Sequence, residues 1–247
     1  MHAYVINMDS AQARWEYVAA EFSKTGIPFQ RVSGVNGRIL QLPIPEFDEV
    51  LYRRRHGKNP NGSTIGCYLS HLKVLRLFLE STNEYAVICE DDIKPVSNLG
   101  TLLEQAIELR EYWDILRLSG FHNSHPRTFA KLSDGYSLAV NFTRLCGSGA
   151  YMVHRQAAEI LLRQLVPMTL PLDHALDREW VYGLKSVSIF PLPVDQVDHA
   201  FGSQIRENVG EKLPVWRRYW TVFPYRALNE VHRVVSRRRQ WKQTKAA

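Results

Sequence analysis

The sequence predicts an α/β protein with a mostly parallel mixed sheet flanked by helices. Short apolar runs rich in β-branched residues alternate with longer segments whose apolar residues recur every three or four positions. The content of 45% apolar and 23% charged residues is ordinary for a globular chain, and none of the 247 residues lies in an apolar stretch long enough to span a membrane. We expect one globular domain over residues 1–215 and a basic, aromatic tail over residues 216–247.

The N-terminal segment predicts a strand, a polar turn and a helix. The strand covers residues 2–6, Asp9 and Ser10 match a helix N-cap, and helical spacing follows at Trp15, Val18, Ala19 and Phe22. A βα turn presents backbone N–H groups and a helix N-terminus to anionic ligands. Asn7 and Arg14 are therefore candidates for ligand contact, although an arginine there can also be solvated.

A second strand is predicted over residues 29–32, followed by a long loop over residues 41–62 with one short helix near residues 46–54. Residues 66–79 predict a strong helix, with apolar side chains at Leu72, Leu75, Phe78 and Leu79. Ser70 and His71 lie in its first half. They are candidates for ligand contact, although for His71 taken alone a helix-capping or core role is the plainer interpretation.

The most informative stretch is residues 85–92, an apolar run that ends in Glu90, Asp91 and Asp92. Its length and composition predict a strand buried on both faces, with the acids at its carboxyl end, where open α/β sheets bind ligands. Three adjacent anions repel each other unless a cation lies among them. Mg²⁺ or Mn²⁺ holding a diphosphate would supply that cation, because these ions favour a few carboxylates together with phosphate oxygens. A solvated acidic loop is the plain alternative.

The remaining elements continue the alternation. A helix is predicted around residues 99–107, strands at residues 113–118, 150–153 and 187–192, a pair of irregular strands within residues 121–145, and a helix around residues 158–165. A further helix opens at Pro171. Asp173 lies near its start, where the helix dipole favours a carboxylate whether or not it has a function.

Basicity is confined to the tail. From Trp216 onward there are nine Lys/Arg and one acid, which leaves 22 bases and 24 acids in residues 1–215. Interleaved basic and aromatic residues suit the interface of an anionic membrane, while a solvated terminus is the alternative. A nucleic-acid-binding protein would carry a basic face on its domain as well, so we expect no nucleic acid partner.

The three cysteines, Cys67, Cys89 and Cys146, are odd in number and lie far apart in apolar surroundings. They predict reduced core residues rather than a disulfide framework or a zinc site. The N-terminus lacks the charged start, apolar core and cleavage site of a signal peptide, so we expect a cytoplasmic protein.

Taken together, several short motifs resemble the family-25 glycosyltransferases, a group that includes galactosyltransferases of bacterial lipooligosaccharide biosynthesis. In chain order the matching pieces are Val5-Ile6-Asn7-Met8-Asp9 with Arg14; Val35-Asn36-Gly37; Gly66-Cys67-Tyr68-Leu69-Ser70-His71; Glu90-Asp91-Asp92; Gly149-Ala150-Tyr151; Pro171-Leu172-Asp173; and Gln196 with Ser203 and Ile205. One departure is Asn36, where the resemblance leads us to expect an acid.

The resemblance implies a GT-A type, Rossmann-like catalytic domain and inversion at the anomeric carbon. It implies a UDP-sugar donor, UDP-galactose above others, and Mn²⁺ or Mg²⁺ as the cofactor. The implied acceptor is a lipid-linked oligosaccharide of lipopolysaccharide or lipooligosaccharide, which would place the enzyme peripherally on the inner face of the cytoplasmic membrane.

The same resemblance suggests roles for individual residues. Glu90 and Asp92 would hold the metal, with His199 or Gln196 as a third ligand. Asp91 would face ribose or sugar hydroxyls. Asp173 is the first candidate for the general base and Asp177 the second, and donor recognition would involve Asn7, Arg14, Ser70 and His71. A metal-dependent phosphotransferase or phosphohydrolase is the competing enzyme class, but the chain lacks the phosphate-cradling motif G-x-x-x-x-G-K-[ST].

Overall fold

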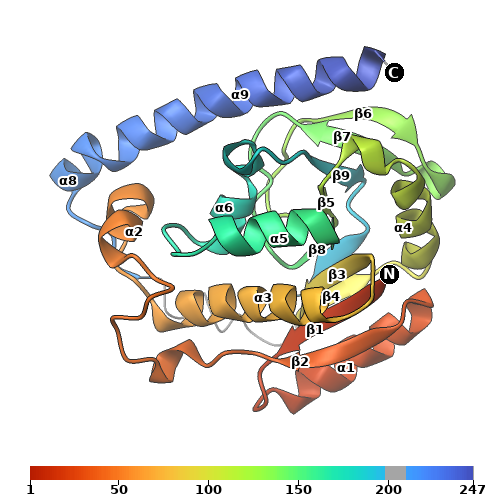
Figure 1. The fold of residues 1–247 in the computed structure, drawn as a ribbon, viewed down its shortest axis with the longest axis horizontal. Coiled ribbons are helices and arrows are strands. Elements are labelled where there is room, and N and C mark those ends of the chain that lie inside the picture. The colour runs from red at the N-terminus through yellow and green to blue at the C-terminus, as the bar shows by residue number, and fades with distance from the viewer. Residues whose placement is uncertain (198–209, 247) are drawn as a thin grey trace.

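The computed structural model describes residues 1–197 and 210–246. An eight-stranded sheet forms its centre (Figure 1). Across this sheet the strands are β2 (Phe29–Ser33), β1 (His2–Asn7), β3 (Tyr85–Glu90), β8 (Ala150–His154), β5 (Ile115–Arg117), β9 (Ser186–Phe190), β7 (Ser137–Asn141) and β6 (Pro126–Lys131). A second, two-stranded sheet joins β4 (Ile93–Pro95) to β10 (Val194–Gln196).

The large sheet is mixed, as predicted. Strand β1 runs parallel to β2 and β3, and β5 runs parallel to β9, whereas β8 is antiparallel to both of its neighbours. Strands β6 and β7 form the irregular antiparallel pair expected between residues 121 and 145, with a register shift between Thr128 and Ala130. The short β4–β10 pair was not anticipated, because three-residue strands carry too little periodicity to be recognised.

Helices cover both faces of the sheet. Helices α1 (Gln12–Phe22) and α4 (Leu99–Glu108) pack on one face, and α3 (Gly62–Glu80) and α5 (Arg155–Gln164) pack on the other. Strand β3 confirms the prediction of a strand buried on both faces, because Val87 and Cys89 point into one core while Ala86 and Ile88 point into the other. The fold is therefore a three-layer α/β structure.

Two helix starts differ from the sequence prediction. The N-cap of α1 is Ala11 and not Asp9 or Ser10, because the Asp9 carboxylate accepts a 2.7 Å hydrogen bond from the Ser33 hydroxyl at the end of the neighbouring strand. Helix α3 begins at Gly62 rather than at residue 66, and the Asn61 side chain caps it. Its first turn is Gly-Ser-Thr, which has no apolar period to reveal it.

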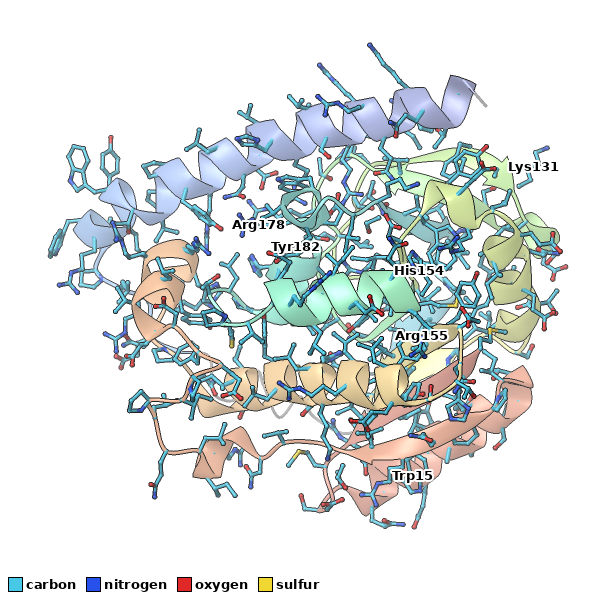
Figure 2. The ribbon with its side chains drawn as sticks, viewed as in Figure 1. Trp15, Lys131, His154, Arg155, Arg178 and Tyr182 are labelled. Carbon is cyan, nitrogen blue, oxygen red and sulfur yellow. The ribbon has the colours of Figure 1, made fainter. Side chains whose placement is uncertain are left out.

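Arg155, at the start of α5, links this helix to the end of α3 on the same face of the sheet (Figure 2). Its guanidinium donates to the carbonyls of Leu79 at 2.7 Å and Ser81 at 2.8 Å, and so satisfies carbonyls at the C-terminus of α3. The long loop predicted before α3 contains α2 (Glu49–His56), which the Asp48 carboxylate caps.

The C-terminal segment forms α8 (Val215–Trp220) and α9 (Val222–Ala246), which run along one side of the domain (Figure 1). Helix α9 buries Arg233, Arg237 and Gln240 against it. Among the described residues, no helix is both long enough and apolar enough to traverse a bilayer. The boundary at residue 215 between domain and tail stays a prediction.

Candidate active site

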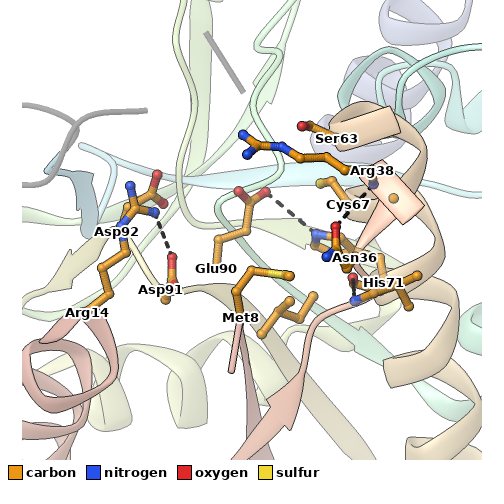
Figure 3. A pocket seen from close by; sticks show the side chains of 14 residues that line it. Met8, Arg14, Asn36, Arg38, Ser63, Cys67, His71, Glu90, Asp91 and Asp92 are labelled. Carbon is orange, nitrogen blue, oxygen red and sulfur yellow. Dashed lines mark hydrogen bonds and ion pairs between the residues drawn. The ribbon is translucent and has the colours of Figure 1, made fainter. Parts of the chain in front are cut away.

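A cleft lies at the carboxyl ends of β1 and β3, the edge where an α/β sheet is expected to bind ligands. It consists of two cavities that share Cys67, Glu90 and Asp92 in their walls. The smaller, of about 120 Å³, lies between the end of β1 and the first half of α3 (Figure 3). The larger, of about 610 Å³, lies between α2 and the short helix α6 (Leu172–Leu176). The acids predicted to hold a cation therefore stand where the two cavities meet.

The wall of the smaller cavity depends on close contact between a loop and a helix. A Cβ at Gly66 would lie 2.5 Å from the carbonyl oxygen of Val35, so only glycine lets this loop rest on α3. Ser70 fastens the loop: its hydroxyl donates to the Gly66 carbonyl at 2.7 Å and accepts from the Val35 amide at 2.8 Å. Asn36 caps the 3₁₀ helix η2 (Gly37–Ile39) by accepting from the Arg38 amide. Ser70, predicted to contact the donor, thus shapes the cavity through the loop.

Asp91 fixes the geometry at the mouth of this cavity. One carboxylate oxygen accepts from Asn7 Nδ2 at 2.7 Å. The other accepts from Arg14 Nη1 at 3.0 Å (Figure 3). The other end of the Asn7 amide accepts from Arg31 Nε at 2.8 Å. These bonds tie the ends of β1, β2 and β3 to α1. The structure therefore brings together the predicted residues Asn7, Arg14 and Asp91, and joins them to one another.

Glu90 points from the end of β3 toward α3 (Figure 3). Its carboxylate accepts a 2.6 Å hydrogen bond from the Ser148 hydroxyl and lies 3.6 Å from Nε2 of the buried His71. The other ring nitrogen of His71 lies 3.1 Å from the Tyr151 hydroxyl. Burial alone would raise the pKa of Glu90, but the His71 ring and the Ser148 hydroxyl outweigh it, so the pKa lies below its ordinary value. Glu90 is thus ionised at neutral pH.

The side chains around Glu90 fit a divalent metal. Nε2 of His71 is buried without a hydrogen-bond partner among the described residues, and ligand atoms of Cys67, His71 and Glu90 lie within 4.8 Å of one another. Burial and the nearby Glu90 carboxylate raise the pKa of the Cys67 thiol well above its usual range, so within this group of three the negative charge comes from Glu90. Oxygen and imidazole donors of this kind suit Mn²⁺ and related ions.

Two candidates for a third ligand were named from the sequence. Gln196 lines the larger cavity, and its Oε1 is buried with no hydrogen-bond partner in the part of the chain that the structure describes. His199, together with Ser203 and Ile205 of the family motifs, lies outside the described residues.

Asp173 lines the larger cavity at the first turn of α6. It is half-buried, and its carboxylate forms no hydrogen bond or ion pair with another described residue. His174, next in sequence, lies edge-on to His56 with ring centroids 5.5 Å apart. Burial and the neighbouring His174 and Lys58 lower the pKa of His56 to about 3, so His56 is neutral at physiological pH. Because the Asp173 carboxylate lines the cavity and has no such partner among the described residues, it is available to a ligand there.

Asp177 has very different surroundings. It is 3% exposed, and its carboxylate accepts from Arg117 Nη1 at 3.1 Å and from the backbone amides of Leu145 and Cys146 at 3.0 and 2.9 Å. Burial would raise the pKa of Asp177, but Arg117 and the Cys146 amide outweigh it and keep the pKa below its ordinary value. Asp177 does not line the larger cavity; it holds the loop that forms one of its walls.

Two residues of this arrangement were missed from the sequence. Arg117 is 1% exposed in the middle of the sheet and also donates to the Cys146 carbonyl at 2.8 Å. A charged residue inside an otherwise apolar strand was the signal that could have revealed it. Ser148 lies in a Gly-Ser-Gly stretch directly before β8, and its hydroxyl donates to Glu90.

Comparison with known proteins identifies a family that the sequence matches. The model of glycosyltransferase family 25, described as an LPS biosynthesis protein, matches residues 1–176. The chain belongs to glycosyltransferase family 25. The family match contains the acidic triplet, the first half of α3 and Asp173.

Several curated proteins are similar to this family-25 chain. A Haemophilus influenzae protein provisionally named a glycosyltransferase is 30% identical over 182 residues, covering 71% of this chain and 61% of the relative. The lipooligosaccharide biosynthesis protein lic2B of the same species is 27% identical, covering 67% and 64%. The lacto-N-neotetraose biosynthesis glycosyltransferase LgtB of Neisseria gonorrhoeae is 22% identical, covering 72% and 65%. The chain thus spans a little under two thirds of the length of these relatives.

Among solved structures, a glycosyltransferase involved in glycosylation of the major capsid of PBCV-1 aligns with a TM-score of 0.37 and 14% identity, over 76% of this chain and 80% of that one. The A197 protein from STIV aligns with a TM-score of 0.40 and 11% identity, with the same two coverages. Likenesses at this level add nothing to the fold described above.

Proposed function

We propose that this protein is an inverting glycosyltransferase that moves a hexose, galactose above others, from a UDP-sugar to a lipid-linked oligosaccharide of lipopolysaccharide or lipooligosaccharide. The observation that carries the proposal is the position of Glu90 and Asp92, which line both halves of a two-part cleft. Such a cleft suits two substrates that must meet at one point. Membership in family 25 and the names of the relatives support the reaction class and the acceptor class.

The smaller cavity suits the nucleotide half of the donor. It is lined by Arg38 and by the amides and side chains at the ends of β1 and β3, and it lies at the edge where nucleotides bind in α/β folds. Asp91, held by Asn7 and Arg14, keeps Glu90 and Asp92 in place, while Ser70 and His71 shape the wall behind them. In this proposal these residues position the donor.

The diphosphate would lie near Glu90 and Asp92, which would hold Mn²⁺ or Mg²⁺ with Gln196 as a further oxygen donor. A divalent metal bound there would neutralise the charge that develops on the leaving UDP. Without a cation, two carboxylates beside a diphosphate would repel it. In this proposal Glu90 and Asp92 therefore bind the metal and do not contact the phosphates directly.

Transfer would take place in the larger cavity, with Asp173 as general base. A hydroxyl oxygen of the acceptor attacks the anomeric carbon, the bond from that carbon to the diphosphate oxygen breaks, and the hydroxyl proton passes to the Asp173 carboxylate. Attack from the side opposite the leaving group inverts the anomeric configuration. Asp177, the second candidate for the base, is excluded from this role in the proposal because its carboxylate is already engaged by Arg117 and two amides.

The direct test is a panel of UDP-sugars incubated with the full chain and Mn²⁺ in the absence of acceptor. We expect slow, metal-dependent release of UDP from UDP-galactose, with other UDP-sugars released more slowly. Asp195→Asn, which changes an exposed carboxylate on β10, is a matched control and should leave the release unchanged. Absence of release from every UDP-sugar, with UDP binding also absent, would refute the proposal.

A further inference from the structure

Exposed apolar side chains gather on the two C-terminal helices. Of the fourteen large apolar side chains that are exposed in the described residues, eight lie on α8 and α9. Val215 and the aromatic ones are on α8 and the first turn of α9, and three aliphatic ones follow along α9: Val215, Trp216, Tyr219, Trp220, Phe223, Leu228, Val231 and Val235. Trp216 and Trp220 are 65% and 76% exposed. Eight exposed apolar side chains on two consecutive helices form a patch, unlike the single exposed apolar residues that are normal on a protein surface.

The rotation of α9 is fixed by its buried face. Arg237 donates to the Glu179 carboxylate at 2.8 Å and to the Ser186 carbonyl at 2.7 Å, and Gln240 donates to the same carbonyl at 3.1 Å. Arg233 donates to the Asp177 carbonyl at 2.8 Å. Because these side chains are satisfied inside the domain, the opposite face of α9 must point outward.

That outward face is apolar and basic together. Exposed Leu228, Val231 and Val235 recur at helical spacing, and exposed Arg238, Arg239 and Lys242 continue the row toward the C-terminus. Two of the helix's arginines face inward and are neutralised there, so the positive charge that remains outside belongs to this face. We call α8 and this row of α9 the outer face.

The aromatic end of the outer face adjoins the larger cavity. The buried Val222 packs over Gly57, where an added Cβ would lie 2.8 Å from its Cγ2 atom. Arg226 donates to the His56 carbonyl at 3.0 Å, and His56 and Lys58 line the cavity. Figure 1 shows α8 beside α2, the helix that carries His56. The exposed tryptophans are therefore held beside the cavity assigned to the acceptor.

We propose that the outer face lies in the interfacial layer of an anionic phospholipid bilayer and holds the larger cavity at headgroup level. Tryptophan and tyrosine favour this layer because one part of the ring system is apolar and the other can remain hydrated, and Lys/Arg are attracted to anionic headgroups. A second copy of the chain is a poorer occupant, since it would bring two basic faces together. Only the link to the acceptor rests on the proposed function; the membrane contact does not.

The test is sedimentation of the full chain with vesicles of phosphatidylglycerol and phosphatidylcholine, compared with vesicles of phosphatidylcholine alone. We expect strong binding only to the anionic vesicles. Trp216→Ala/Trp220→Ala should weaken it on the order of a hundredfold, because two large aromatic surfaces are lost. Arg238→Gln/Arg239→Gln should weaken it on the order of tenfold at low salt. Ile39→Ala, an exposed apolar residue on η2, is the matched control and should bind as the unaltered chain does.

The double variants change only exposed side chains, so a circular dichroism spectrum like that of the unaltered chain should accompany the loss of binding. Equal binding by the tryptophan variant would overturn the proposal. So would binding of single-stranded DNA by the outer face in place of vesicles, or a dimer that the same variant dissolves. These readouts use no sugar donor, so failure here leaves the proposed transfer reaction untouched, and failure of UDP binding leaves the membrane contact untouched.

Discussion

Asp173 and Asp177 stand one turn apart at the two ends of α6, yet their carboxylates have opposite surroundings. Asp177 is buried and engaged by Arg117 and two backbone amides, while Asp173 is half-buried in a cavity wall and has no such partner among the described residues. One aspartate, Asp177, therefore holds the loop that forms a cavity wall, while the other, Asp173, presents its carboxylate to the cavity. Sequence spacing alone cannot separate these two roles.

The acidic triplet repeats the contrast within three residues. Asp91 is held by Asn7 and Arg14, whereas Glu90 and Asp92 line both cavities. Asp91 is held by two side chains that carry N–H donors, whereas the Glu90 carboxylate accepts from a hydroxyl and lies 3.6 Å from an imidazole nitrogen. This pattern explains why a run of acids is compatible with a stable fold.

Asp173→Asn should have the largest effect. We expect transfer to fall by about 10² to 10⁴-fold, since a general base is lost, while donor binding and the free energy of unfolding stay near those of the unaltered enzyme. Steady-state transfer and calorimetry of UDP binding measure the two parts. Asp134→Asn, an exposed carboxylate that lines neither cavity, is the control. Unchanged transfer in Asp173→Asn would remove this residue from the mechanism.

Asp177→Asn should affect stability instead. Removing one partner of the buried pair leaves the Arg117 charge uncompensated, which should lower the free energy of unfolding by about 3–5 kcal/mol. Urea denaturation measures this change. If Asp177→Asn is as stable as the unaltered chain but loses transfer, Asp177 is the general base and its assignment to Asp173 is wrong.

Ser148→Ala should have a smaller, local effect. It removes the 2.6 Å hydrogen bond that orients the Glu90 carboxylate, and loss of an orienting contact behind a metal ligand costs about tenfold in metal affinity. Titration of Mn²⁺ in the presence of UDP measures it. Ser23→Ala removes the hydroxyl of an exposed serine that lines neither cavity, and it should show little change.

The smallest effect concerns acid stability. The pKa of Asp177 is held below its ordinary value of 3.8, so its contribution to stability is complete above that pH and is lost as pH falls through the lower, folded-state value. The stability difference between the unaltered chain and Asp177→Asn should therefore be constant from pH 7 to about 5 and shrink below about 4. Urea denaturation at several pH values measures it. A difference that grows toward low pH would contradict the assigned direction of the shift.

The sequence predicts much of the fold because the elements that matter are strongly patterned. The apolar run before Glu90 and the leucine spacing of α3 and α4 identify their elements, and the order of short motifs indicates the family that the match over residues 1–176 shows. The failures have physical reasons. Asp9 takes a partner on β2 that no local pattern reveals, and the start of α3 consists of small residues without a period.

The site was harder to predict because its architecture depends on contacts between distant segments. Arg117 on β5 donates to Asp177 and to the Cys146 carbonyl, and Ser148, in the loop before β8, donates to Glu90. The arginines of α9 were counted as tail charges, although Arg233 and Arg237 are buried and paired. Such pairings follow from tertiary structure and have no sequence spacing of their own.

Calorimetry of UDP binding in the presence and absence of Mn²⁺ tests the central claim most directly, namely that Glu90 and Asp92 hold a metal for a nucleotide. We predict binding heat for the unaltered chain only when Mn²⁺ is present, loss of that heat in Asp92→Asn, and its retention in the control Asp195→Asn. Metal-independent UDP binding, or full metal-dependent binding in Asp92→Asn, would contradict the account.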